Sequence, residues 1–557
     1  MTRGPLRAHP ATGCGTMDGA MPATPSIPRS SADPAPVPLG PTHPTPAVAA
    51  QAAAAQAPAE SAREWPFPIR TALLGLAGMV LIAAGGMGAG ATLIHDPLLA
   101  NGAFNWIRYG HGQLLATWIL YMGLGLAIWA WIRLGRHARA GRVNHAYMIR
   151  VIVLWIVPLL IAPPLFSKDV YSYLAQGDLA LHGLDPYGVG PSALPSALSD
   201  NVSIVWQNTP SPYGPLFVLL AKGIVAITGD GLVSLISGVI LMRLVLAVGF
   251  ALLWWALPRL CAKLGGDSSV ALWLVGANPL LVVHLIGGAH NDMLMIGLMA
   301  VGVVFVLDRK HVAGIALLAL AFSMKATAAI ALPFVVWIWM AHIPYGTRSY
   351  RFVKAAGPAI GIFGGVFVLC TLLAGVDLGW IPALSGSSIV INWLSLPSGL
   401  GQAAYTVLNW FVGFGDMQPF VTVTRTLGSL LLAYILVKQW WLARDGGNDA
   451  IRRAAIGMAA FALLAPVTLP WYFSWALVLA AGFAWGTAGL TLAACGSVWL
   501  LLITYPSGGT ALYDWGYLFV ILGVSVLAAV SLLKPDPLKL SLWTVKDVPE
   551  RALGHHS

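Results

Sequence analysis

The side chains best suited to chemistry lie in the polar segment 167–215, the longest interruption in an otherwise apolar chain. The segment opens with SKDVYSYLAQGDLALHGLDPYG and ends with WQNTPSPYGP. A single cation, Lys168, accompanies four carboxylates, which are Asp169, Asp178, Asp185 and Asp200. A carboxylate at a membrane surface can act as a general base toward a hydroxyl group. The segment is therefore a candidate active site.

Asp169 has the most favourable position of the four carboxylates. We expect Ser167 to cap a helix, which places Asp169 in the first turn, where the helix dipole stabilises an ionised carboxylate. Tyr173 and Gln176 follow at i+4 and i+7 and share its face of the helix. We predict that Asp169 is the base; the alternative is that it only stabilises the helix terminus.

The other carboxylates of the segment are weaker candidates. Asp178 lies further along the same predicted helix, and Asp200 lies in a polar stretch without a recognisable motif. Asp185 begins a DPYG sequence in which proline sets the bend, so turn formation is the favoured interpretation of this residue.

Polar groups beside later apolar segments are predicted to converge on the same place. His290, Asn291 and Asp292 end one span, where helix capping is an equally good interpretation. Lys325 stands alone in an apolar segment, and a cation within the membrane is a functional candidate that could contact a lipid phosphate. The alternative is that its amine merely snorkels to the surface. Arg425 is a weaker candidate of the same kind.

Two further pairs of residues carry less information. Trp471 and Tyr472 lie in a connection between spans, where an aromatic belt at the membrane surface is favoured over sugar stacking. His284 and Arg243 fall inside predicted spans and are expected to pair with polar groups that the sequence does not identify.

The composition defines the class of protein that carries these residues. Apolar residues make up 58% of the 557 positions, charged residues 9%, and mean hydropathy is +0.76, which together indicate an all-α, polytopic membrane protein. The net charge of +10 comes from short basic clusters between apolar segments, a pattern that sets membrane topology and argues against nucleic-acid binding. The four cysteines have no metal-binding or disulfide spacing.

Alternating basic and neutral connections predict about fourteen spans, with both termini in the cytoplasm and segment 167–231 outside. Residues 1–68, rich in Pro and Ala, are expected to form a disordered cytoplasmic tail, and 534–557 a second cytoplasmic tail. The catalytic domain then covers 69–533. Residues 216–228 are too short to span easily and are predicted to form an interfacial or re-entrant helix on the outer side.

Nucleotide-binding and hydrolase motifs such as the P-loop, GxGxxG, HExxH and GxSxG are absent from the sequence in a supporting context. A cytoplasmic nucleotide-sugar site is therefore unsupported. An enzyme whose polar segments lie outside is expected to draw its donor from the lipid.

Several motifs resemble a known family of membrane enzymes. LLIAPPLFSKDVYSYLAQG, GLDPYGVGP, PSPYGPLF, ANPLLVVHLIGGAHND and LPWYFSWAL are similar to polyprenol-phosphomannose-dependent α-1,6-mannosyltransferases of the MptB type, members of the GT-C superfamily. The resemblance extends from about residue 71 to about 533. It implies an inverting transfer of mannose from polyprenyl-phosphate-mannose to an α-1,6-mannan acceptor in lipomannan and lipoarabinomannan synthesis, at the outer face of the plasma membrane.

The resemblance also implies roles for individual residues. Asp169 would be the base, while Lys325 and Arg425 would contact the donor phosphate. The residues expected to contact substrate are Tyr173, Gln176, Asp178, Asp185, Tyr187, Tyr213, His290, Asn291, Asp292, Trp471 and Tyr472. No metal and no cofactor beyond the lipid-linked donor are expected.

Two alternatives remain at this point. The same fold could use another polyprenyl-phosphate sugar, such as arabinose. Isolated charges within many spans could also belong to a flippase or transporter of lipid-linked sugars, although the sequence has no clear inverted repeat.

Overall fold

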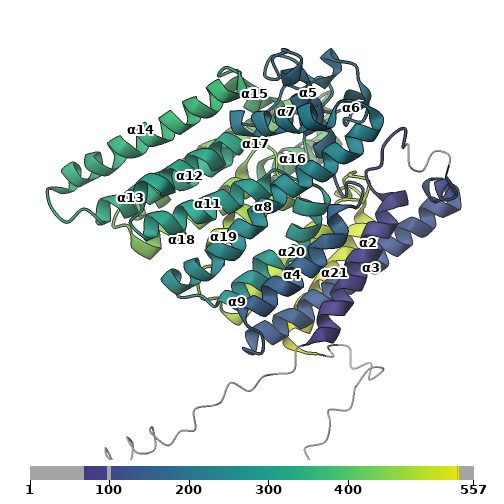
Figure 1. Cartoon of the computed structure of the whole chain (residues 1–557), viewed down its shortest axis with the longest axis horizontal. Coiled ribbons are helices and arrows are strands. Elements are labelled where there is room, and N and C mark those ends of the chain that lie inside the picture. The colour runs from purple at the N-terminus through teal and green to yellow at the C-terminus, as the bar shows by residue number, and fades with distance from the viewer. Residues whose placement is uncertain (1–67, 97–101, 536, 538–557) are drawn as a thin grey trace, which may run out of the picture. The chain divides into compact units, whose positions relative to one another are not determined.

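The computed structural model describes residues 68–96, 102–535 and 537, and the regular elements among them are helices (Figure 1). Two isolated β-bridges, Gly265 with Phe483 and Thr504 with Thr510, supplement the helices. The predicted all-α class is confirmed. The two predicted tails, 1–68 and 534–557, lie almost entirely outside the described residues.

The first half of the described chain contains α2 (Ile69–Ala89), η1 (Asn105–Arg108), α3 (Gly110–Arg139), α4 (His145–Leu160), α5 (Asp169–Leu181), η2 (Pro191–Ala193), α6 (Ala197–Asp200), α7 (Pro215–Thr228), α8 (Leu232–Leu264), α9 (Ser268–Ala271), η3 (Leu272–Gly276), α10 (Pro279–Leu281) and η4 (Val282–Gly287). The second half contains α11 (Asp292–Leu307), α12 (His311–Met324), η5 (Ala326–Ala331), α13 (Leu332–Ala341), α14 (Arg348–Ala374), α15 (Trp380–Ala383), η6 (Leu384–Ile389), α16 (Leu396–Val412), α17 (Gln418–Leu442), α18 (Gly447–Leu464), η7 (Pro470–Tyr472), α19 (Phe473–Ala480), α20 (Thr487–Leu502) and α21 (Trp515–Leu533).

Seven helices of the described part are long and apolar enough to cross a membrane. They are α2, α3, α8, the continuous run Ser268–Gly287, α14, α17 and α21. Shorter apolar helices of 10–17 residues, among them α4, α11, α12 and α20, lie between them in the chain. The protein is therefore polytopic, and the count of fourteen spans stays a prediction.

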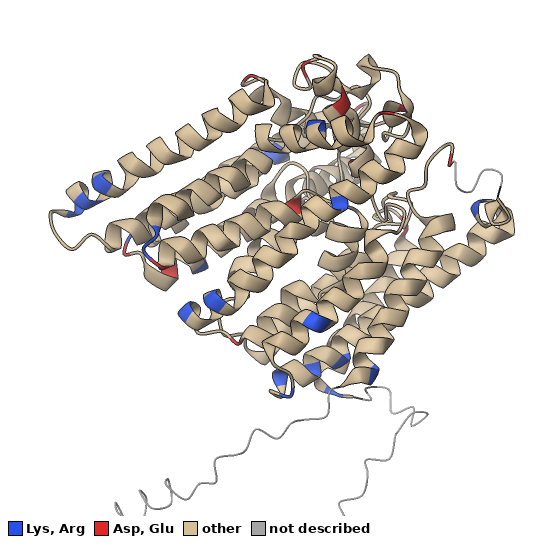
Figure 2. Ribbon diagram, viewed as in Figure 1, with Lys and Arg blue, Asp and Glu red and all other residues tan. Residues whose placement is uncertain are grey.

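Basic side chains gather at one end of the helix bundle. Figure 2 shows most Lys and Arg residues at the end opposite α5 and α6. At that end, Arg136 and Arg139 of α3 donate to the backbone oxygens of Ser531 and Leu532, at 3.0 and 3.2 Å, and so bind the last turn of α21. Cations at a helix C-terminus also satisfy its unpaired carbonyl groups.

Glycines allow the central helices to approach closely. A Cβ atom on Gly249 of α8 would lie 2.1 Å from the backbone oxygen of Met293, and one on Gly297 of α11 would lie 2.6 Å from that of Gly249. Small residues at such contacts let two backbones meet, which is the usual packing device of membrane helices. The contact fixes the first turn of α11, which starts at Asp292, against α8.

The helix α5 is held in the same way against its neighbour α7. A Cβ atom on Gly177 would lie 2.5 Å from the backbone carbonyl carbon of Ala221. Because α7 covers Pro215–Thr228, the predicted helix at 216–228 is confirmed, and its interfacial or re-entrant placement stays a prediction. The helix that carries Asp169 is thus packed closely against the helix that follows the polar segment.

Arg243 of α8 ties together the two segments that lead to the site. Its side chain is fully buried and donates to five backbone oxygens. These belong to residues 160, 162 and 163, at the end of α4 and just after it, and to residues 286 and 287, which end η4. The partners that the sequence could not identify for this residue are therefore main-chain carbonyl groups.

Replacement of Arg243 tests this connection. We expect Arg243→Met to lower stability by about 3 kcal/mol or more, because several buried carbonyl groups lose their donor at once. Thermal unfolding of the purified protein in detergent would measure the change. Arg259→Gln, in the exposed part of the same helix, is the matched control, and equal melting temperatures for the two variants would contradict the connection.

Candidate active site

Asp169 is the first residue of α5 and so lies in the first turn of a helix, as the sequence predicted. Its backbone N–H donates to the Ser167 hydroxyl at 3.0 Å, although Lys168 occupies the capping position itself. The preceding Phe166 has φ of 62°, a left-handed conformation that costs energy for a large side chain, and its N–H donates to the backbone oxygen of Pro506 at 2.8 Å. The backbone conformation of Phe166 and its hydrogen bond to Pro506 therefore fix the position at which α5 and Asp169 begin.

The Asp169 carboxylate lies where two cavities meet. One cavity, of about 830 Å³, is the more polar of the two and is called the polar cavity; its walls include Lys168, Asn392, Thr468 and Tyr513. The other, of about 530 Å³, is mainly apolar, with walls that include Ile330, Phe461, Pro466 and Val467 together with the amine-bearing Lys325. The residues that line both are Asp169, Trp206, Val390, Leu469 and Trp471. One carboxylate can therefore face the contents of both cavities.

Burial raises the pKa of Asp169 from its ordinary value to about 6. The nearby Lys325 charge and the Ser167 hydrogen bond oppose this rise, and the Asp292 charge adds to it. The side chain keeps 18% of its surface exposed, toward the cavities. A carboxylate with a pKa near 6 is largely ionised at neutral pH, yet more basic than one in water, which suits proton abstraction.

His290 approaches Asp169 from the turn before α11. Its Nδ1 lies 3.5 Å from Asp169 Oδ2, and its ring stacks on Trp471 with centroids 3.7 Å apart. The predicted convergence of His290 with Asp169 is thus found in the structure. Trp471 stacks on His290 and also lines both cavities. This position in the site differs from the membrane-belt role that composition favoured.

Lys325 forms a buried ion pair with Asp292. Its Nζ lies 2.9 Å from both carboxylate oxygens of Asp292, which is fully buried, and Trp475 Nε1 donates to Asp292 Oδ1 at 2.6 Å. Lys325 also lies 4.8 Å from the ring centroid of Tyr472, at a break between α12 and η5. Asp292 therefore orients Lys325, and Lys325 faces the apolar cavity, so neither is a simple cap or a snorkelling side chain.

Other predicted residues surround the apolar cavity less directly. Gln176 and Tyr213 line it, and the Gln176 side-chain oxygen accepts a hydrogen bond from Ser211 at 2.9 Å. Tyr173 is buried behind them in edge contact with Tyr213 and Phe217. Tyr173 therefore supports the wall of the cavity and does not line it.

Arg425 uses its guanidinium to hold one wall of the site. It donates to the backbone oxygens of Ser388 and Val390, at 2.8 and 2.7 Å, and to the Ser398 hydroxyl at 2.9 Å. Ser388 and Val390 line the apolar cavity, whereas Arg425 does not. The contact of Arg425 with a donor phosphate stays a prediction, and its observed role is to shape the cavity wall.

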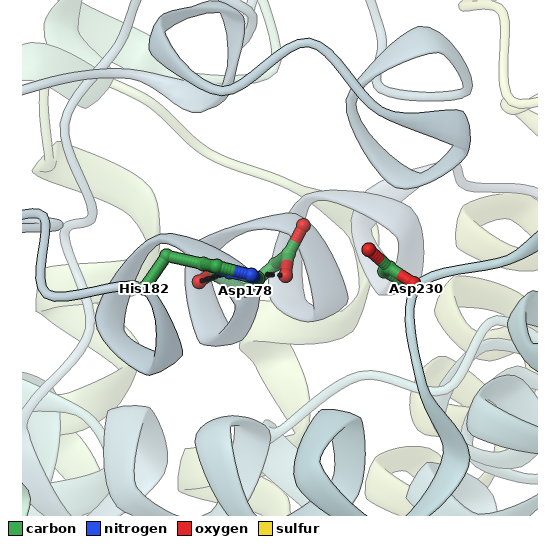
Figure 3. A group of neighbouring side chains, drawn as sticks. All are labelled: Asp178, His182 and Asp230. Atoms are coloured by element: carbon green, nitrogen blue, oxygen red, sulfur yellow. Dashed lines mark hydrogen bonds and ion pairs between the residues drawn. The ribbon is translucent and has the colours of Figure 1, made fainter.

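Asp178 lies near the end of α5 and lines neither cavity. Its Oδ1 lies 3.0 Å from His182 Nδ1, and its Oδ2 accepts from the Ser196 hydroxyl at 3.3 Å. Figure 3 shows Asp178 between His182 and Asp230, whose ligand atoms all lie within 4.8 Å of one another. Because His182 and Ser196 contact both its oxygens, Asp178 joins α5 to α6.

Three more predicted residues lie outside the two cavity walls. The side chain of Asp185 accepts from the N–H of Tyr187 at 2.9 Å, which is the turn role that the sequence favoured. Tyr187 is buried in a small cluster with Trp380. Asn291 is fully buried beside His290, and its amide has no hydrogen-bond partner among the described residues.

Sequence reasoning missed two aromatic residues of the site, Trp206 and Trp475. Trp206 lines both cavities, and Trp475 lines the apolar cavity while it donates to Asp292. The available signal for Trp475 was its place four residues after Trp471, which is one helical turn. No comparable signal marks Trp206, which lies in an irregular connection.

Comparison with known proteins gives a consistent result over most of the chain. Residues 72–341 match the family model described as alpha-(1->6)-mannopyranosyltransferase, N-terminal domain, and residues 397–534 match the MptB C-terminal domain. Alpha-(1->6)-mannopyranosyltransferase A of Mycobacterium tuberculosis is 42% identical over 460 residues, covering 81% of this chain and 87% of that protein.

Two relatives from Corynebacterium glutamicum extend the comparison. Alpha-(1->6)-mannopyranosyltransferase A is 34% identical over 78% of this chain and 92% of that protein, and alpha-(1->6)-mannopyranosyltransferase B is 30% identical over 74% and 72%. No solved structure matches the chain.

The two matched regions together cover most of the chain between residues 72 and 534. The chain belongs to the alpha-(1->6)-mannopyranosyltransferase family, and the protein is a mannosyltransferase. The family resemblance inferred from the sequence motifs is confirmed.

The ion pair between Lys325 and Asp292 yields a test by double substitution. We expect Lys325→Met alone to destabilise the protein by about 3–5 kcal/mol, because it leaves the carboxylate of Asp292 buried without its cation. The double variant Lys325→Met with Asp292→Asn should be less destabilised than the sum of the single variants. Thermal unfolding in detergent measures all four proteins, and strictly additive effects would show that the two side chains are not coupled.

Proposed function

We propose that this mannosyltransferase moves mannose from a polyprenyl-phosphate donor to the 6-hydroxyl of an α-1,6-mannan acceptor. The observation that carries the proposal is the position of Asp169 between an apolar cavity with a lysine and a polar cavity. The lipid-linked donor is the less polar of the two substrates and matches the apolar cavity, whereas the acceptor glycan matches the polar cavity.

The apolar cavity suits the donor. Its aliphatic and aromatic walls suit the first isoprene units, and Lys325, with 14% of its side chain exposed, offers a positive charge for the phosphate. Tyr472 and Trp475 flank the amine and limit its movement. Because Asp292 fixes Lys325 in advance, little reorganisation is needed as negative charge grows on the leaving phosphate.

The polar cavity suits the acceptor glycan. Hydroxyl, amide and amine groups of Lys168, Asn392, Thr468 and Tyr513 provide hydrogen-bond donors and acceptors for sugar hydroxyl groups. Trp206 and Trp471 add aromatic surface at the boundary with the donor cavity. A volume of about 830 Å³ falls within the range of ordinary ligand pockets.

The proposed reaction is a single displacement with inversion. The acceptor 6-hydroxyl gives its proton to Asp169, and its oxygen attacks the anomeric carbon of a β-mannosyl phosphate. The bond between that carbon and the phosphate oxygen breaks as the new α-1,6 bond forms. Polyprenyl phosphate leaves beside Lys325, and Asp169 later releases the proton to water.

The same proposal includes the cellular setting. We infer a GT-C fold with about fourteen spans, cytoplasmic termini and an active site at the outer face of the plasma membrane, in lipomannan and lipoarabinomannan synthesis. The concentration of basic residues at the end opposite α5 supports this orientation. The proposed chemistry requires neither a metal nor a cofactor, since Lys325 provides a charge for the leaving group.

Substitution of the base tests the proposal directly. We expect Asp169→Asn to reduce mannose transfer by about 10²–10⁴-fold, because an amide cannot accept the proton. The assay measures transfer of labelled mannose from polyprenyl-phosphate-mannose to a synthetic α-1,6-mannoside by purified protein. Asp416→Asn is the matched control: its carboxylate only accepts from the Gln418 N–H, an interaction that asparagine retains.

The same assay distinguishes the competing functions. Activity of Asp169→Asn equal to that of the unaltered protein would remove Asp169 as the base. A preference for polyprenyl-phosphate-arabinose, supplied separately, would overturn the choice of sugar. Absence of transfer by the unaltered protein, together with movement of the lipid-linked sugar across vesicles, would favour the flippase.

The pKa of Asp169 predicts how kcat/KM for mannose transfer depends on pH. Its carboxyl group is protonated below pH about 6 and then cannot act as a base, so kcat/KM should fall about tenfold per pH unit below that value and level off above it. Initial rates at low donor concentration between pH 4.5 and 8 would measure this limb. A profile with a midpoint near 4, typical of an exposed carboxylate, would contradict the assigned environment.

A further inference from the structure

We infer that His290 is a positioning residue, whose neutral imidazole donates its Nδ1–H to Asp169 and holds one carboxylate oxygen so that the other faces the acceptor hydroxyl. The inference rests on the proposed function of Asp169 as the base and assigns His290 a role that differs from substrate contact.

The geometry provides the first step. His290 Nδ1 lies 3.5 Å from Asp169 Oδ2, slightly beyond a hydrogen bond, and neither ring nitrogen of His290 has a hydrogen-bond partner among the described residues. His290 is fully buried and lines neither cavity. A buried imidazole with unused nitrogens, aimed at a carboxylate from behind, can orient that carboxylate without touching substrate. Such contacts commonly shorten when substrate binds.

The imidazole itself is held in a fixed position. Trp471 stacks on its ring at 3.7 Å, and the preceding Ala289 has φ of 55°, a left-handed conformation that turns the chain sharply before α11. Two residues further back, Gly287 accepts a hydrogen bond from Arg243. The position of His290 is therefore determined by stacking, by backbone strain and by a tether to α8.

Burial, together with nearby charges, keeps His290 neutral. Burial lowers the pKa of His290 well below its ordinary value, and the neighbouring His284 and Lys325 lower it further. Lys325 and Asp292 act on Asp169, and His284 and Lys325 act on His290. The other ionisable groups nearby are Tyr173, Tyr213 and Tyr472, with Lys168 on the wall of the polar cavity. A neutral donor stabilises the carboxylate without pairing with it as a cation, so Asp169 remains basic.

Two substitutions distinguish the role of the Nδ1 donor of His290 from the role of its stacked ring. His290→Phe keeps the ring on Trp471 and removes the donor, whereas His290→Asn keeps an amide N–H near the position of Nδ1 and removes the ring. For His290→Phe we expect kcat to fall about 10–100-fold with KM changed less than about twofold, and the acid limb of the pH profile to move upward by about one unit. For His290→Asn the limb should stay within about 0.3 units of the unaltered protein.

The matched control is His284→Phe. His284 is also fully buried, and its ring packs against Trp471 at 5.5 Å, but among the described residues it forms neither an ion pair nor a hydrogen bond with Asp169. Its substitution should leave the acid limb in place even if stability falls. If His290→Phe does not fold, His290→Gln replaces it, because the longer amide reaches the position of Nε2 and cannot restore a donor at Nδ1.

The outcomes distinguish this inference from the proposed function. An unshifted acid limb in His290→Phe or His290→Gln, or equal shifts in His290→Asn and the donor-free variant, would overturn the role of His290 while an inactive Asp169→Asn still supports Asp169 as the base. Full activity of Asp169→Asn would overturn the proposed base itself. A shift confined to the variants without the Nδ1 donor supports the inference.

Discussion

The geometry of the site depends on one buried guanidinium. A charged group among apolar helices is tolerated only when its hydrogen bonds are satisfied, and Arg243 finds its acceptors in five main-chain oxygens. These oxygens occur where helices end, at the positions at which free carbonyl groups need donors. One side chain therefore satisfies the ends of two helical segments and fixes both. The segment after residue 163 leads to Asp169, and the segment after residue 287 leads to His290.

Features that depend on local sequence could be predicted. Asp169 was singled out by its place in the first turn of a helix, and Asp185 by a turn sequence, and both positions follow from hydrogen bonds within a few residues. Lys325 was recognisable because a lone cation in an apolar segment has a large desolvation cost. The helical class and the helix 215–228 followed from composition and hydrophobic length.

Features that depend on tertiary contacts could not be predicted. The partner of Lys325 is Asp292, 33 positions away, and Asp292 in turn binds Trp475, 183 positions away. No local pattern specifies such pairs. In the sequence, Arg243 and Arg425 resemble Lys325, because all three are cations in or near apolar segments. In the structure, however, both arginines donate to backbone oxygens and support the surroundings of the site. A polar residue in an apolar segment can be recognised as important from the sequence. Only the fold shows whether it supports the site or lines the cavity in which the reaction would occur.

The presence of two cavities that meet at Asp169 has a kinetic consequence. Each cavity has its own volume, so one substrate does not occupy the space of the other, and both can be present when the bond forms. Under the proposed function, initial rates would then follow a ternary-complex pattern, with intersecting double-reciprocal lines. An elongated glycan could also stay in its cavity while spent lipid is replaced in the other, which would permit several additions in one encounter.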